Sequence, residues 1–150
     1  MSERCDNRSV GVIMTDETGR ILLINRAKPP YGWAPPAGHI DDHGGSLDTA
    51  IAEVSEETGL GLSGEDMRLV MEGYRIHGQC RRGGEYHDWD VWTTPLPSGE
   101  PVAKPDEVRG ILVADTFALH ALAQQTPYAT YERPGLEPAW ATLLSELGHL

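Results

Sequence analysis

The sequence predicts a mixed α/β fold in which one β-sheet packs between helices. Short segments rich in β-branched and aliphatic residues are separated by turn residues in the first part of the chain. One amphipathic helical segment interrupts these predicted strands, and two more helical segments follow the last of them. Strands that alternate with helices indicate a covered sheet, and 150 residues suit one domain with a single core.

The N-terminal part of the chain predicts a β-hairpin followed by a loop. Residues 9–15 and 21–25 are apolar and rich in β-branched types, which favours two buried strands. Residues 16–19 between them have the composition of a hairpin turn. Residues 27–38 contain four prolines and two glycines, so we expect a shaped loop without regular structure.

The middle of the chain predicts a helix and then a second hairpin. Residues 46–58 have helical periodicity, with Ser46 as the expected N-cap and Gly59 as the expected stop. Residues 67–80 and 85–94 are expected to pair as antiparallel strands around a glycine-containing turn.

The C-terminal third predicts one more strand and two helices. Residues 108–114 favour a strand, and Asp115 is placed to cap a helix over about 116–125. The last helix is expected after Pro134-Gly135, because apolar residues recur there at near-helical spacing. They are Leu136, Trp140, Leu143, Leu144 and Leu147.

Charge and composition narrow the classes of function. With 12 Lys and Arg against 23 Asp and Glu, the net charge of −11 argues against a basic groove for duplex nucleic acid. An acidic chain suits a protein that recruits a divalent cation and takes its anionic substrate as a metal complex. No apolar run approaches a membrane span or a signal peptide, so we expect a cytoplasmic protein with no membrane partner. Cys5 and Cys80 do not indicate a disulfide framework.

Three glutamates share one face of the predicted central helix. At about 100° per residue, Glu56 and Glu57 fall within about 60° of Glu53, and apolar residues occupy the adjoining face. Like charges at these spacings repel one another, and a bound cation removes that cost. Carboxylate oxygens are ligands that Mg²⁺ and Mn²⁺ prefer, so the cluster indicates a metal site. A solvated acidic face is the alternative.

The spacing around these glutamates resembles the Nudix box, G-x5-E-x7-R-E-U-x-E-E-x-G-U, where U is aliphatic. The match runs from Gly38 to Leu60 without an insertion, and seven of the nine specified positions agree. Agreement over this length is specific. Gly44 and Ala52 stand where the motif has glutamate and arginine. The chain thus resembles the Nudix hydrolase family (MutT-like), with a degenerate box.

This resemblance implies a fold and an activity. The fold is an α/β/α sandwich with a mixed β-sheet between helices, expected here as one domain over residues 1–150. The activity is Mg²⁺-dependent or Mn²⁺-dependent hydrolysis of a phosphoanhydride bond in a nucleoside diphosphate linked to another moiety. NTPs, ADP-ribose, nucleotide sugars, dinucleoside polyphosphates and NADH all remain open as small-molecule nucleotide substrates, because the box does not encode the leaving group. A homodimer is a further family-based expectation.

The resemblance also implies roles for particular residues. Glu53, Glu56 and Glu57 are the expected catalytic glutamates, and together with the Gly38 carbonyl they are the expected metal ligands. One carboxylate must act as general base for the attacking water. Glu53 is the first candidate, and Glu107, just before a predicted strand, is an alternative base.

Three other residues are candidates for substrate contacts. Arg26 ends the second predicted strand and can reach a phosphate, Trp33 can stack on a base, and His39 directly follows the first glycine of the box. Along residues 86–92, side chains alternate between two faces of a predicted strand, and the sequence does not say which face looks into a pocket.

The two substitutions in the box leave two interpretations open. Losing an acid at Gly44 and a base at Ala52 together keeps the local charge unchanged, so the loop can be held in another way. The same substitutions suit a catalytically weakened Nudix-fold module that binds a nucleotide or regulates without cleaving it. Tight nucleotide binding without turnover would identify such a module.

Overall fold

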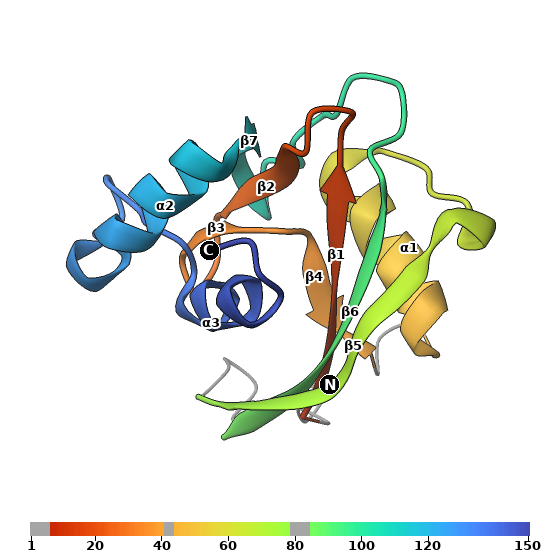
Figure 1. The fold of residues 1–150 in the computed structure, drawn as a ribbon, viewed down its shortest axis with the longest axis horizontal. Helices are drawn as coiled ribbons and strands as arrows, with labels where there is room; N and C mark the ends of the chain where they lie inside the picture. Colours follow the sequence, from red (N-terminus) through yellow and green to blue (C-terminus); the bar gives the residue numbers. More distant parts are fainter. Residues whose placement is uncertain (1–6, 41–43, 79–84) are drawn as a thin grey trace.

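A mixed sheet lies between helices in the computed structural model, which describes residues 7–40, 44–78 and 85–150 (Figure 1). Helix α1 covers one face, and α2 and α3 cover the other. This arrangement confirms the predicted α/β/α sandwich. Both cysteines lie outside the described residues. No described helix is long and apolar enough to cross a membrane.

The predicted strands and helices are present, with small shifts of their bounds. The strands are β1 (Arg8–Thr15), β2 (Ile21–Arg26), β3 (Gly32–Ala34), β4 (Ala37–His39), β5 (Arg68–His77), β6 (Tyr86–Pro95) and β7 (Val108–Ala114). The α-helices are α1 (Ser46–Thr58), α2 (Thr116–Gln125) and α3 (Pro138–Glu146), and short 3-10 turns occur at Gly64–Asp66 and Thr126–Tyr128.

The prediction that residues 27–38 form no regular structure was wrong. This segment holds β3, which pairs with β2, and β4, which pairs with β1. Pro35 and Pro36 separate the two strands, and a proline lacks the N–H that a central strand needs. Each strand is consequently only three residues long.

The start of α1 also differs from the prediction. Gly45 is the N-cap, and Ser46 is the first helical residue. The Ser46 hydroxyl accepts a hydrogen bond of 2.9 Å from Nε1 of Trp92 in β6, so it fastens the helix to the sheet. The predicted stop at Gly59 is confirmed, because this residue adopts the left-handed conformation (φ 74°) at the C-cap.

Strand β1 divides the sheet into two parts. On one side it pairs in parallel with β6 along its whole length. On the other side it pairs with β4 near its start, from Ser9 to Gly11, and with β2 only at Thr15. Strands β3 and β7 extend the sheet from β2. Strands β2 and β4 therefore share one edge of β1 at its opposite ends (Figure 1).

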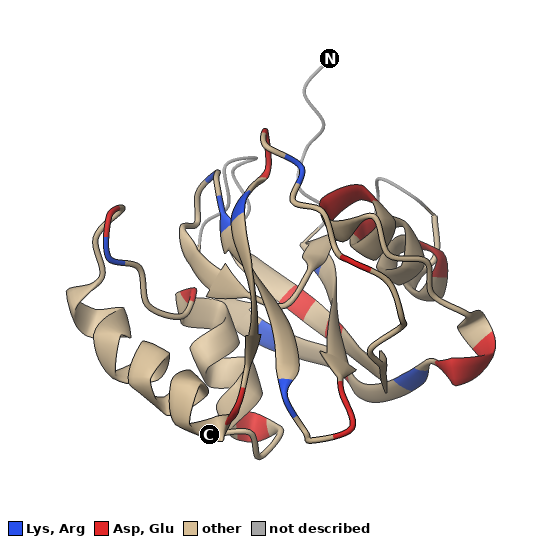
Figure 2. Ribbon diagram, turned by 90° about the horizontal axis from the view of Figure 1, so that it is seen from above, with Lys and Arg blue, Asp and Glu red and all other residues tan. Residues whose placement is uncertain are grey.

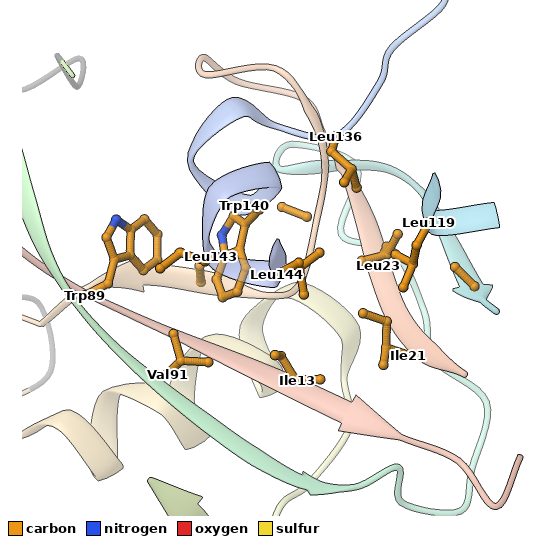
Figure 3. Close-up of a cluster of buried hydrophobic side chains, with 13 residues drawn as sticks. Ile13, Ile21, Leu23, Trp89, Val91, Leu119, Leu136, Trp140, Leu143 and Leu144 are labelled. Carbon is orange, nitrogen blue, oxygen red and sulfur yellow. The ribbon is translucent and has the colours of Figure 1, made fainter. Parts of the chain in front are cut away.

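Side chains of β1 alternate between two cores. Val10, Val12 and Met14 are buried with Val54 of α1 on one face. On the other face, Ile13 is buried in a cluster that also contains the apolar residues of α3 (Figure 3). Aromatic contact strengthens this second core, because the rings of Trp89 and Trp140 meet edge to face with centroids 5.2 Å apart.

Leu144→Ala tests whether α3 is an integral part of the core. Leu144 is fully buried, so the substitution should lower the free energy of unfolding by about 2–5 kcal/mol. Leu69→Ala, at a side chain that is 40% exposed on β5, should cost about 0.5 kcal/mol or less. Urea denaturation measures both. Equal losses would contradict the packing of α3 described here.

Candidate functional site

Helix α1 turns its acidic face toward a cleft. The side chains of Glu53 and Glu57 are 7% and 4% exposed, whereas Glu56 is exposed at the rim. Ala50 and Val54 on the adjoining face are fully buried and fix the rotation of the helix. Acidic residues recur along α1, while α2 and α3 are almost free of charge (Figure 2).

The two buried carboxylates of α1 lie against the backbone of strand β4. The backbone N–H of Ala37 donates a hydrogen bond of 3.0 Å to Oε1 of Glu57. Gly38 lies so close to Glu53 that a Cβ atom at this position would overlap the Glu53 carboxylate. The first glycine of the motif is thus required by the approach of Glu53, and any side chain there would displace that carboxylate.

Burial sets the protonation of Glu57. Loss of solvent is the main cause that raises its pKa, from 4.5 to about 8. The charge of Arg26 and the Ala37 N–H oppose this effect, and the charges of Glu107 and Glu56 add to it. A buried carboxylate is costly unless its charge is compensated, so this position favours either a proton or a bound cation.

Strand pairing brings Arg26 and Glu107 together from distant parts of the sequence. Arg26 at the end of β2 is paired with Val108 at the start of β7. The Ala27 N–H donates to the Glu107 carbonyl oxygen at 2.9 Å, which fixes the backbone before β7 beside the end of β2. Both Arg26 and Glu107 line the cleft with the glutamates of α1.

The cleft has a volume of about 740 Å³, within the usual range for small-molecule sites. Its far wall comes from β5, β6 and the start of α3, and includes His77, His87, Trp89 and Ala139. The strand register explains why β6 forms part of this wall. Ser9 of β1 is paired with His39 of β4 on one side and with Trp89 of β6 on the other, so all three lie in one row across the sheet. The cleft-facing side of residues 86–92, which the sequence left open, is therefore the one with His87 and Trp89.

Most of the sequence-predicted site residues meet in this cleft. Those that line it are Arg26, Gly38, His39, Glu53, Glu56, Glu57 and Glu107. Trp33 does not line it. Asn25 of β2 is paired with Trp33 on one side and Gly110 on the other, and the Trp33 ring extends across this row toward Gly110. The ring packs against the core instead.

Sequence reasoning missed one acidic residue of the cleft. Glu137 is 6% exposed and caps α3, where its Oε1 accepts a hydrogen bond of 3.0 Å from the Ala139 N–H. Burial raises its pKa, and the Ala139 N–H and the charge of Arg26 act in the opposite direction. Its only sequence signal is its place directly before Pro138, a residue favoured in the first turn of a helix.

The donors of the cleft suit a hard divalent cation. In the described part of the chain, no three His, Cys, Asp or Glu side chains are gathered closely enough to hold an ion as they stand. Mg²⁺ does not require such a cage, because it keeps several waters and is bound by one or two carboxylates together with substrate phosphates. Glu53, Glu57 and the Gly38 carbonyl fit this smaller requirement.

Hydrogen bonds fix the start of α1, where the motif's usual acid and base are absent. Gly44 has φ 96°, a conformation that favours glycine, and a Cβ there would meet open space. The Thr49 hydroxyl donates to the carbonyl oxygens of Gly45 at 2.7 Å and Ile40 at 3.3 Å. Together with the Ser46 bond to β6, these contacts fix the start of α1.

Comparison with known proteins agrees with the motif. A NUDIX domain model matches residues 6–137. The asymmetrical bis(5′-nucleosyl)-tetraphosphatase of Rattus norvegicus is 38% identical over 58 residues, which are 39% of this chain and 37% of that protein. The similarity to this curated relative therefore spans less than half of its length.

Two solved structures share the fold. An Ap4A hydrolase from C. elegans, in a binary complex, has a TM-score of 0.63 at 16% identity, covering 93% of this chain and 96% of that chain. The NUDIX domain of NrtR from Shewanella oneidensis, complexed with ADP ribose, has a TM-score of 0.66 at 13% identity, covering 98% and 88%. At these identities the likeness shows the fold alone.

Glu57→Gln tests the cost of the buried carboxylate in metal-free protein. Between pH 4.5 and about 8 the folded state binds a proton at Glu57 that the unfolded state has released. The free energy of unfolding contributed by this group therefore falls as the pH rises, by up to about 1.4 kcal/mol per pH unit. Relative to wild type, Glu57→Gln should gain stability from about pH 5 to pH 8 in EDTA.

Urea denaturation at both pH values measures this difference. Glu100→Gln, on the exposed loop after β6, is the matched control and should follow the wild type. A stability difference between Glu57→Gln and wild type that does not change with pH would show that Glu57 is not buried in this way.

Proposed function

This chain belongs to the Nudix family, and we propose that it is a pyrophosphohydrolase that cleaves a phosphoanhydride bond in a nucleoside diphosphate linked to another group, with Mg²⁺ or Mn²⁺ as cofactor. One observation carries the proposal. Two buried carboxylates, Glu53 and Glu57, open on a cleft that also holds the guanidinium of Arg26. Such a cleft can receive a cation and the anionic diphosphate together.

The metal would be held at the boundary between α1 and β4. Glu53, Glu57 and the Gly38 carbonyl are its proposed ligands, with Glu56 at the rim sharing the metal or ordering its water shell. When bound, the metal supplies neutralisation of the diphosphate charge during in-line displacement by water. It would also take the place of the proton that burial favours on Glu57.

The chain's own residues would supply the proton transfer and the phosphate contacts. Glu53 is the first candidate to accept the proton of the attacking water, and Glu107 is the alternative base. Arg26 and His39 carry donors for phosphate oxygens, and a guanidinium suits this role because it presents several N–H groups in one plane.

The relatives suggest which substrates to test first. The rat relative is named a bis(5′-nucleosyl)-tetraphosphatase, so dinucleoside tetraphosphates head the panel. The NrtR domain was solved with ADP ribose, which provides a diphosphate of different shape. NTPs and nucleotide sugars complete the set. The volume of the cleft is compatible with part or all of each compound.

A binding module without turnover is the second candidate. The glycine and alanine at positions 44 and 52 favour it, because they remove the charged pair that accompanies the glutamates of the motif. The bonds from Ser46 and Thr49 favour the enzyme, since they hold the start of α1 without that pair. A rise in melting temperature with Mg²⁺ but no turnover of any compound would identify the module.

Glu57→Gln should lower metal-dependent turnover by about 100-fold or more, because it removes one of the proposed metal ligands. Phosphate release from the substrate panel, with coupled phosphatase and with Mg²⁺, Mn²⁺ or EDTA, measures the effect. Glu100→Gln removes an acid outside the cleft and should keep wild-type turnover. Near-normal turnover by Glu57→Gln would sink the assignment.

Glu53→Gln and Glu107→Gln, made separately, should distinguish the two candidate bases. Loss of a general base lowers kcat by about 100-fold to 10,000-fold. We expect the larger loss of kcat for Glu53→Gln, together with weaker metal binding because Glu53 is also a proposed ligand. A larger loss for Glu107→Gln, with unchanged metal affinity by calorimetry, would transfer the role of base to Glu107.

A further inference from the structure

Three segments bring Arg26 and Glu137 to the same side of the cleft. Arg26 in β2 is paired with Gly32 in β3. The next residue of β3, Trp33, forms an isolated parallel bridge with Leu136. The N–H of Trp33 donates a hydrogen bond of 2.8 Å to the carbonyl oxygen of Gly135. The carbonyl oxygen of Trp33 accepts a hydrogen bond of 2.9 Å from the N–H of Glu137. The start of α3 is thereby fastened to the edge strand next to Arg26.

Glycine is required at position 32 for this approach. Gly32 has φ 128°, a conformation that side-chain-bearing residues rarely adopt. A Cβ at this position would also lie 2.7 Å from the backbone nitrogen of Glu137 and 2.9 Å from its Cα. The absence of a side chain lets the start of α3 reach the position from which Glu137 and Arg26 both line the cleft.

Glu137 is a second buried acid in the cleft, and the positive charge of Arg26 acts to lower its pKa. Its Oε1 accepts a hydrogen bond from the helix it caps, which offsets part of the cost of burial. The charge of Arg26 offsets another part, and the same charge also acts on Glu57. The positive charge of Arg26 therefore favours the ionised form of two buried acids, one on α1 and one at the start of α3.

The described bonds of Arg26 fix only one part of its head group. Nε donates to the carbonyl oxygen of Pro30 at 2.6 Å, so the terminal amino groups remain as donors for other partners. Glu137 lines the same cleft, and a negative charge on its side chain would attract these groups.

Building on the proposed function, we propose that Glu137 is a positioning residue: its carboxylate holds the Arg26 guanidinium where the guanidinium donates to a substrate phosphate. Whether removal of the Glu137 charge tightens or weakens substrate binding distinguishes this role from a purely electrostatic effect. Removing a negative charge from a cleft that binds an anion should tighten binding by Coulomb's law alone. Loss of a positioning residue should weaken binding instead.

Glu137→Gln is the central variant, because its amide oxygen can still accept the hydrogen bond from the N–H of Ala139. We expect KM for the preferred substrate and Kd for ADP with Mg²⁺, measured by calorimetry, to rise about tenfold. The kcat should stay within about twofold, since Glu137 does not touch the reacting atoms. Glu137→Asp keeps the charge and should bind more tightly than Glu137→Gln.

Two further variants test the route through Arg26. If Glu137 acts through this arginine, the double variant Arg26→Gln with Glu137→Gln should bind no more weakly than Arg26→Gln alone. Glu146→Gln removes an exposed acid from the same helix and should bind as the wild type does. Unchanged or tighter binding by Glu137→Gln, or additive losses in the double variant, would overturn the proposal.

A measurement on the protein without substrate separates this inference from the proposed function. Nuclear magnetic relaxation of the Arg26 Nε–H reports the order of the side chain. Glu137→Gln should make this group more mobile, and Glu146→Gln should not. Greater mobility in a protein that cleaves nothing would mean that the proposed function fails while the positioning role stands. An Arg26 that stays equally ordered in Glu137→Gln would overturn the positioning role even in an active enzyme.

Discussion

The structure depends on placing two carboxylates against the backbone of one short strand. The side chain of Glu53 packs against Gly38, and the carboxylate of Glu57 accepts a hydrogen bond from the N–H of Ala37. Both side chains are buried, so the folded chain carries a cost that only a hydrogen-bond donor, a proton or a cation can reduce. This one requirement accounts for the glycine in β4 and for the chemistry that the cleft can support.

The topology of the sheet provides the room for this arrangement. Strand β1 pairs with β2 at one end and with β4 at the other, while β6 occupies its second edge. Helix α1 can then direct its carboxylates to β4, and β2 brings Arg26 to the same cleft. The opposite core, which contains Trp140, seats α3 so that Glu137 also lines the cleft.

The start of α1 lacks the acid and the base that the motif usually carries, and uncharged contacts hold it. Gly44 adopts a conformation suited to glycine, and neutral hydrogen bonds of Thr49 and Ser46 fix the residues that follow it. Neutral bonds of this kind do not depend on ionic strength as a surface ion pair does. The glutamates that face the cleft are therefore held by contacts in which the missing acid and base take no part.

By itself the sequence determined most of the order of the elements, the acidic face of α1 and the motif that begins at Gly38. These follow from local periodicity and from a motif that spans 23 residues, both of which can be read along one segment. Only the tertiary structure decided that β3 and β4 form on either side of Pro35-Pro36, that Trp33 packs on the core and that Glu137 lies in the cleft. Each of these outcomes rests on pairing or packing between segments far apart in the chain, and such contacts leave no periodic signal in the sequence.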